Sequence, residues 1–206
     1  SIQNEPDFTP SGTSYAYEAG CYVNSTQTST RAGYPQALAA VKTALQAAGL
    51  GSTRFIGPDT TAIGGNKIPN YLNNLPTGSV VAIAHHLYHD DPATSTSALS
   101  TLDSQYPYAT WPKFMTELNP YDQYESPAFD GQPDWMQLAV TMHNVFVYER
   151  ANAYLVWNVM YGTIGYWNGQ PVGTATYHPL GHYSKFIRPG DRRALGVERE
   201  GRRVQI

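Results

Sequence analysis

Segments typical of buried strands alternate with segments typical of amphipathic helices along most of this chain. Residues 79–88 form an almost continuous apolar run without polar alternation, which is typical of a strand buried on both faces. Residues 35–48 instead repeat apolar side chains at spacings of three and four, as one face of a helix does. This alternation predicts an α/β fold built on a parallel sheet.

Five strands are predicted, with helices between them. The strands end near Glu5, Ile56, Tyr88, Glu117 and Tyr161. The helices are predicted over residues 35–48, 66–75, 94–104, 134–149 and 178–186. Residues 162–173, which contain several glycines, are predicted as a loop, and residues 194–206 as one strand of a different layer.

Two glutamates stand at the predicted ends of strands. Glu5 directly precedes Pro6, which cannot donate a hydrogen bond to a sheet and therefore ends the pairing. Glu117 closes segment 112–117 and is followed by a loop with Pro120. Barrel enzymes hold catalytic groups at the carboxyl ends of their strands, and glycoside hydrolysis requires a pair of carboxylates. The pair therefore favours a glycoside hydrolase, whereas either glutamate alone would be interpreted as a solvated turn residue.

Four short motifs follow one another along the chain: SIQNEPD at residues 1–7, HLY at 86–88, KFMTE at 113–117 and HYSKFIRPG at 182–190. Together they resemble glycoside hydrolase family 30, most closely its bacterial xylanase branch. The resemblance implies a (β/α)8 TIM barrel with an attached β-sandwich, of which strands 4–8 would be present here. It implies a partial catalytic barrel in residues 1–187 and the beginning of the side domain in residues 188–206.

The resemblance also implies a reaction and the residues that carry it. Glu5 would be the general acid/base and Glu117 the nucleophile of a retaining hydrolysis of β-linked glycans. Asn4 would hydrogen-bond the sugar 2-hydroxyl beside the nucleophile. Without the resemblance, Asn4 would be interpreted as a turn-capping residue.

Three further residues are expected to line the same site. His86 and Tyr88 are two positions apart on a predicted strand, and hence on one face. They are expected to line the sugar subsite, with the Tyr88 hydroxyl keeping Glu117 ionised. Trp157 is expected to form the floor under the sugar that is cleaved, although the residue by itself would be interpreted as core.

The substrate is expected to be β-1,4-xylan without a requirement for acidic side groups. Glucuronate-dependent xylanases of the family carry arginines just after the last-strand tryptophan, whereas this chain has Val159, Met160 and Tyr161 there. Uncharged side chains cannot offer the bidentate contact that a carboxylate prefers. Two alternatives remain. One is a β-1,6-glucanase, a galactanase or another β-glycosidase of the same family, and the other is a non-catalytic carbohydrate-binding remnant. The family and substrate imply a secreted, monomeric protein whose partner is a polysaccharide or oligosaccharide.

Composition excludes several other function classes. A net charge of −3 without a basic cluster in the body of the chain argues against nucleic-acid binding. No apolar run approaches the roughly 20 residues that span a bilayer, so no membrane contact is expected. The histidines and aspartates at positions 85–91 match no zinc-binding spacing, and no metal or other cofactor is expected. The 16 tyrosines and 4 tryptophans fit a protein that handles carbohydrate.

Overall fold

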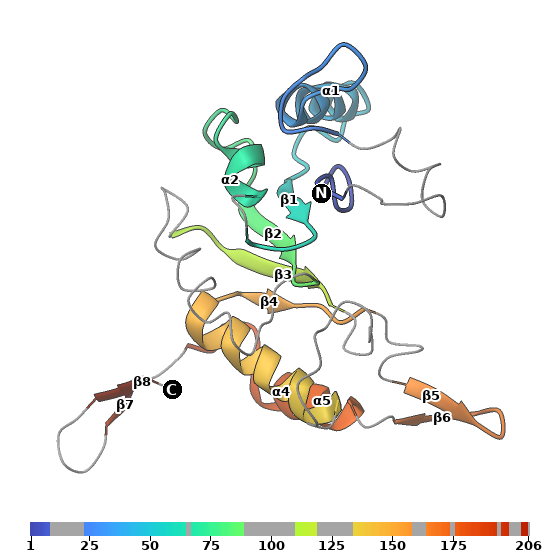
Figure 1. The fold of residues 1–206 in the computed structure, drawn as a ribbon, viewed down its shortest axis with the longest axis vertical. Coiled ribbons are helices and arrows are strands. Elements are labelled where there is room, and N and C mark those ends of the chain that lie inside the picture. Colours follow the sequence, from blue (N-terminus) through green and yellow to red (C-terminus); the bar gives the residue numbers. More distant parts are fainter. Residues whose placement is uncertain are drawn as a thin grey trace.

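The protein is described by a computed structural model over residues 1–8, 23–64, 67–88, 110–118, 134–157, 164–173, 176–192, 195–197 and 203–205. Its main sheet has four parallel strands in chain order (Figure 1). These are β1 (Ile56–Thr60), β2 (Ala82–His86), β3 (Lys113–Glu117) and β4 (Ala153–Tyr154). The predicted α/β class and parallel sheet are therefore confirmed. Closure into a barrel stays a prediction.

Helices lie on both sides of this row of strands. They are α1 (Tyr34–Ala47), α2 (Lys67–Leu72), α4 (Asp134–Asn144), the π-helical turn η3 (Val145–Glu149) and α5 (Tyr177–Phe186). In Figure 1, α1 and α2 lie near β1, whereas α4 and α5 lie beyond β4. Helix α1 has a proline in its first turn, where the missing N–H costs nothing. It ends before Gly49, whose φ of 78° suits glycine.

The core lies between the sheet and its helices. Every residue of β2 is buried, as the apolar run predicted for a strand covered on both faces. Ile83 of β2 and Met115 of β3 are fully buried, and they pack in one cluster with Leu38 of α1, Ile68 of α2 and Val145 of η3. The cluster holds the carboxyl ends of β2 and β3 in place.

Two strand predictions in the first third of the chain are wrong. Residues 1–8 contain no strand, so the predicted strand ending at Glu5 is absent. The second strand does not end at Ile56 but runs through Gly57 and Pro58 to Thr60. Proline is tolerated there because, among the described residues, β1 pairs only with β2 and its other edge needs no N–H donor.

The C-terminal part of the chain differs from the prediction in four places. The last strand of the main sheet, β4, ends at Tyr154 and not near Tyr161 as predicted, and the described residues 155–157 are not in a strand. The predicted loop 162–173 contains a hairpin of β5 (Ile164–Trp167) and β6 (Gln170–Gly173). Its Asn168-Gly169 turn has positive φ at both residues, which matches the twist of a two-residue hairpin. The predicted strand 194–206 is a second hairpin, β7 (Leu195–Val197) with β8 (Arg203–Gln205). The predicted helix 134–149 changes to the π turn after residue 144.

Two predictions are not decided by these elements. The predicted helix 94–104 lies outside the described residues. The division at residue 187 into a barrel and a β-sandwich also stays a prediction. In the described part of the chain, no helix combines the length and apolar character that a membrane span needs.

Candidate active site

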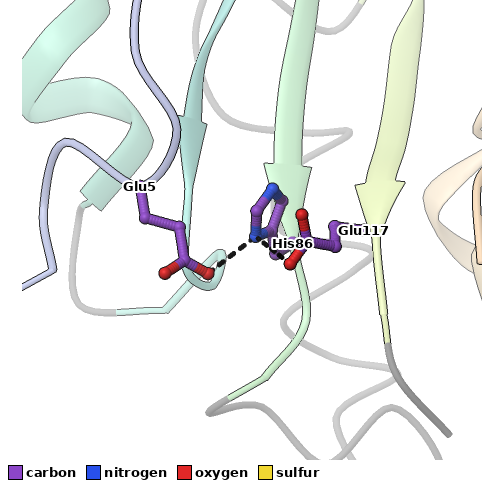
Figure 2. Close-up of side chains that lie close together, drawn as sticks. All are labelled: Glu5, His86 and Glu117. Atoms are coloured by element: carbon purple, nitrogen blue, oxygen red, sulfur yellow. Dashed lines mark hydrogen bonds and ion pairs between the residues drawn. The ribbon is translucent and has the colours of Figure 1, made fainter. Parts of the chain in front are cut away.

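Three ionisable side chains meet at the carboxyl end of the parallel sheet. His86 is the last residue of β2, Glu117 is the last residue of β3, and the parallel register pairs the two. Glu5 approaches them from the N-terminal segment, and Figure 2 shows the His86 ring between the two carboxylates. Parallel strands bring their carboxyl ends to one edge, which is why residues far apart in sequence meet here.

The distances make one connected group of these side chains. His86 Nδ1 lies 2.8 Å from Glu5 Oε1 and 3.9 Å from Glu117 Oε1. The nearest donor atoms of the three residues all lie within 4.8 Å of one another. The His86 side chain is 1% exposed, whereas the side chains of Glu5 and Glu117 are 16% and 19% exposed. Both carboxylates can therefore reach a bound molecule, and the imidazole lies beneath them.

His86 is positively charged at neutral pH. Burial alone would lower its pKa, but the side chains of Asp59 and Glu5 and the charge of Glu117 raise that pKa to about 9. Its second ring nitrogen, Nε2, lies 3.5 Å from Asp59 Oδ1. One imidazolium is thus surrounded by three carboxyl groups.

Opposing effects act on the pKa of Glu117. Burial raises its pKa, while the His86 charge and a hydrogen bond from Tyr88 lower it, and the net pKa is above the ordinary value. The Tyr88 hydroxyl donates to Glu117 Oε1 at 3.0 Å. The Tyr88 ring also meets the His86 ring edge to face, with centroids 5.8 Å apart. His86 and Tyr88 together therefore favour the anionic form of a half-buried carboxylate.

Glu5 has an unusual backbone conformation. Its φ of 46° lies in the left-handed region, which non-glycine residues rarely adopt. Its N–H donates to the Asp59 carbonyl at 2.9 Å, and its carbonyl accepts from the Phe8 N–H at 3.0 Å. The Tyr71 hydroxyl donates to the carbonyl of Pro6 at 2.9 Å. Such strained positions persist where the surroundings hold them, and they cluster at functional sites.

The segment that carries Glu5 is anchored by Asp7. The Asp7 carboxylate accepts hydrogen bonds from the Thr61 N–H at 2.9 Å and from the Thr61 hydroxyl at 2.7 Å, and it pairs with Lys67 at 2.9 Å. Sequence reasoning did not assign Asp7, Asp59 or Thr116 to the site. The sequence held a signal for Asp59, because Asp59 comes shortly after the end of a predicted strand, which is the setting that singled out Glu5.

The two remaining predicted site residues lie at the same end of the sheet. Asn4 is exposed beside Glu5. The Trp157 N–H donates to the carbonyl of Leu118, the residue after Glu117, at 2.9 Å, and its side chain is half-exposed. Their contacts with a sugar stay predictions. The uncharged positions 159–161 lie outside the described residues.

Glu5, His86 and Glu117 are also the residues that could hold a metal ion among those described. One His nitrogen and two carboxylate oxygens are suitable donors for a divalent cation. Only neutral imidazole binds a metal, so a cation would have to displace the proton that the raised pKa of His86 keeps on the ring.

The fold resembles that of a glycoside hydrolase. A solved GH30 endoxylanase from Clostridium papyrosolvens C71 matches with a TM-score of 0.53 and 22% identity, over 92% of this chain and 41% of that chain. This chain thus spans less than half the length of that enzyme. No protein-family model and no curated protein sequence matches it.

Proposed function

We propose that this protein is a retaining glycoside hydrolase of family 30 that cleaves β-linked polysaccharide. The observation that carries the proposal is the separation of two half-buried carboxylates, whose nearest oxygens lie within 4.8 Å at the end of a parallel sheet. Retaining enzymes hold their two carboxyl groups about 5–5.5 Å apart, whereas inverting enzymes need about 6.5–9.5 Å to admit a water molecule. The spacing at Glu5 and Glu117 supports retention.

In the proposed reaction, Glu117 attacks the anomeric carbon while Glu5 protonates the departing glycosidic oxygen. Glu5 then removes a proton from the water that releases the sugar from Glu117, so both residues return to their starting states. His86 and Tyr88 keep the attacking carboxylate anionic. Asn4 binds the 2-hydroxyl, and Trp157 lies under the sugar.

The proposed substrate is β-1,4-xylan, cleaved internally and without dependence on glucuronate groups. The likeness to an endoxylanase fold supports the class of polymer, and the uncharged residues 159–161 support independence from an acidic group. A β-1,6-glucan or galactan is the alternative substrate, and a non-catalytic carbohydrate-binding remnant is the alternative function. Secretion and a monomeric state are part of the proposal.

Product release from undecorated xylan and from glucuronoxylan tests the substrate. We expect rates within about threefold of each other, because no charged contact to the uronate is proposed. Proton NMR of the first products should show the β-anomer before mutarotation. Strict dependence on glucuronate would contradict the assignment, and an initial α-anomer would contradict retention. Activity on β-1,6-glucan alone would move the assignment to the alternative.

Replacing Tyr88 by Phe is expected to move the acidic limb of the pH–rate profile upward. The substitution removes a donor to the Glu117 carboxylate, so the pKa of Glu117 rises further and the anion forms only at higher pH. The expected shift is roughly one pH unit, with kcat/KM about tenfold lower on the acidic side. Tyr183→Phe is the matched control, because its hydroxyl donates to the Ala139 carbonyl between α4 and α5. Equal profiles for the two variants would contradict the role of Tyr88.

A further inference from the structure

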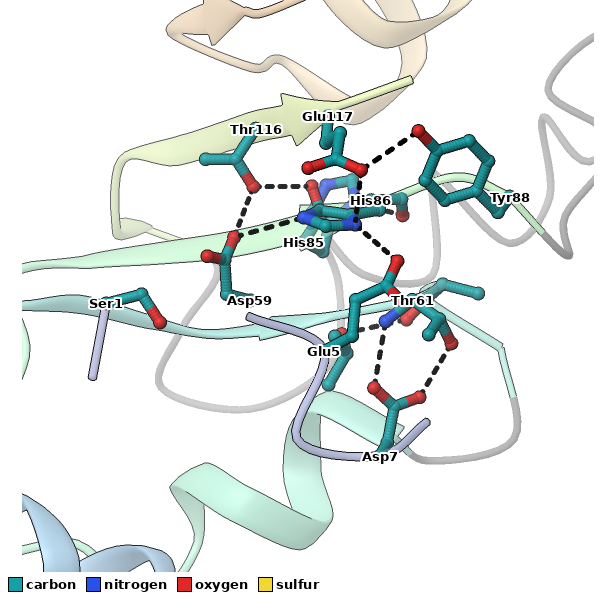
Figure 3. Close-up of polar contacts among 12 residues, drawn as sticks. Ser1, Glu5, Asp7, Asp59, Thr61, His85, His86, Tyr88, Thr116 and Glu117 are labelled. Carbon is teal, nitrogen blue, oxygen red and sulfur yellow. Dashed lines mark hydrogen bonds and ion pairs between the residues drawn. The ribbon is translucent and has the colours of Figure 1, made fainter. Parts of the chain in front are cut away.

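Asp59 lies where three separate segments of the site meet. Its Oδ1 accepts a hydrogen bond from the Thr116 hydroxyl of β3 and lies 3.5 Å from His86 Nε2 at the end of β2. Its backbone carbonyl accepts the Glu5 N–H at 2.9 Å. Figure 3 shows the Asp59 carboxylate beside Thr116 and His86, across the His86 ring from the Glu5 carboxylate. A single residue of β1 thus contacts the segments that carry both glutamates.

The hydrogen-bonding geometry at His86 depends on Asp59. Nδ1 of His86 faces the Glu5 carboxylate, and Nε2 faces the Asp59 carboxylate. Asp59 is an anion and only accepts hydrogen bonds, so Nε2 must carry hydrogen. Glu5 Oε1 also accepts, because a general acid that directs its proton at the substrate carries that proton on Oε2, so Nδ1 must carry hydrogen as well. These two acceptors therefore select the imidazolium form of His86.

Asp59 is itself held as an anion in a fixed position. Burial alone would raise its pKa, but the hydrogen bonds with His86 and Thr116 and the charge of His86 bring the pKa below its ordinary value. The Thr116 hydroxyl also lies 3.1 Å from the His85 carbonyl, which ties the contact to β2. The φ of Asp59 is 73°, a left-handed conformation that aspartate tolerates better than most residues. The residue type thus suits both its backbone and its contacts.

We propose that Asp59 is a positioning residue that holds His86 as a doubly protonated, oriented cation beneath the two glutamates. The charged and titratable groups facing His86 are Glu5, Asp59, Glu117 and Tyr88, and of these only Asp59 faces Nε2 among the described residues. Its catalytic consequence rests on the proposed glycosidase function. Asp59 acts through His86 and does not touch the substrate.

The direct test is NMR titration of the His86 ring nitrogens in the wild-type protein and in Asp59→Asn. In the wild type, both nitrogens should carry hydrogen at pH 7.5. In Asp59→Asn, the titration midpoint of His86 should fall by at least one pH unit, since Nε2 loses its anionic neighbour. Asp191→Asn is the matched control, because Asp191 accepts the Arg188 N–H at an exposed turn after α5 and does not face the His86 ring. Its His86 midpoint should stay within about 0.3 units.

Two results would overturn the proposal. The first is a neutral His86 ring in the wild-type protein at pH 7.5. This measurement does not require the Asp59→Asn variant to fold. The other is an equal His86 midpoint in Asp59→Asn and Asp191→Asn. Neither measurement needs turnover, so a failure of the glycosidase proposal is distinguished from a failure of this one.

Kinetic measurements on Asp59→Asn distinguish a positioning role of Asp59 from a general effect on stability. In Asp59→Asn, the acidic limb of the pH–rate profile should move to higher pH, because Glu117 loses the favourable charge of the His86 cation. We expect kcat to fall about tenfold at the optimum with little change in KM. A merely structural role would scale the activity equally at every pH and leave the acidic limb in place.

Discussion

Replacing Glu117 by Gln is expected to abolish turnover while leaving the fold intact. Among the described residues at the end of β3, the Glu117 carboxylate is the group that makes the attack in the proposed reaction, and an amide is not a nucleophile under these conditions. Gln has nearly the same shape, and its amide oxygen can still accept the Tyr88 hydroxyl. The expected loss in kcat is about 10⁴-fold or more, the scale of removing an essential nucleophile.

The measurement is release of reducing sugar from undecorated xylan, with circular dichroism to confirm folding. Asp191→Asn is the matched control, since it also converts a carboxylate to an amide but at an exposed turn after α5, where Asp191 accepts the Arg188 N–H. Residual activity above about 1% in Glu117→Gln would contradict its role as nucleophile. Sugar binding without turnover in wild type and variant alike would instead favour the non-catalytic alternative.

Breaking the buried ion pair between His85 and Glu149 is expected to have the largest effect on stability. Both side chains are 0% exposed, and His85 Nε2 lies 2.6 Å from Glu149 Oε1. His85 Nδ1 lies 2.9 Å from the His86 carbonyl, which only accepts, so Nδ1 carries hydrogen. His85→Leu leaves the Glu149 carboxylate buried without its cation. The expected cost is about 3–5 kcal/mol in the free energy of unfolding.

The double variant His85→Leu, Glu149→Leu should recover most of that loss. Replacing both partners removes both desolvated groups, including Glu149 Oε2, which has no hydrogen-bond partner among the described residues. Urea unfolding of the wild type, both single variants and the double variant measures the coupling. A single variant that costs less than about 1 kcal/mol, or a double variant less stable than either single one, would contradict a buried ion pair.

The pH dependence of this pair has a definite sign. Burial alone would lower the pKa of His85, but Glu149 raises it above the ordinary value of 6.5. The stabilisation from the raised pKa is therefore fully present below about pH 6.5 and is lost as pH rises through the folded-state pKa. The difference in unfolding free energy between the wild type and the double variant should therefore decrease as the pH rises above about 6.5. An increase with pH there would contradict the assignment.

The residue pattern alone determined the type and rough location of most elements near the site. Burial on both faces is a local property, so the apolar run at residues 79–88 was enough to predict β2. Helix periodicity likewise predicted α1 to within one residue at each end. The proposed catalytic pair, Glu5 and Glu117, came from their setting before a loop and a proline and from the motifs around them, although the strand predicted before Glu5 is absent.

Only the tertiary structure decided which side chains meet. His85 and His86 are adjacent in sequence, yet one pairs with Glu149 in the core and the other lies between the two glutamates. The strand register shifts between these two histidines, and the sequence has no local signal for that irregularity. The contact of Asp59 with His86 likewise depends on the pairing of β1 with β2. Side-chain partners distant in sequence follow from register and packing, whereas helices and buried strands follow from local periodicity.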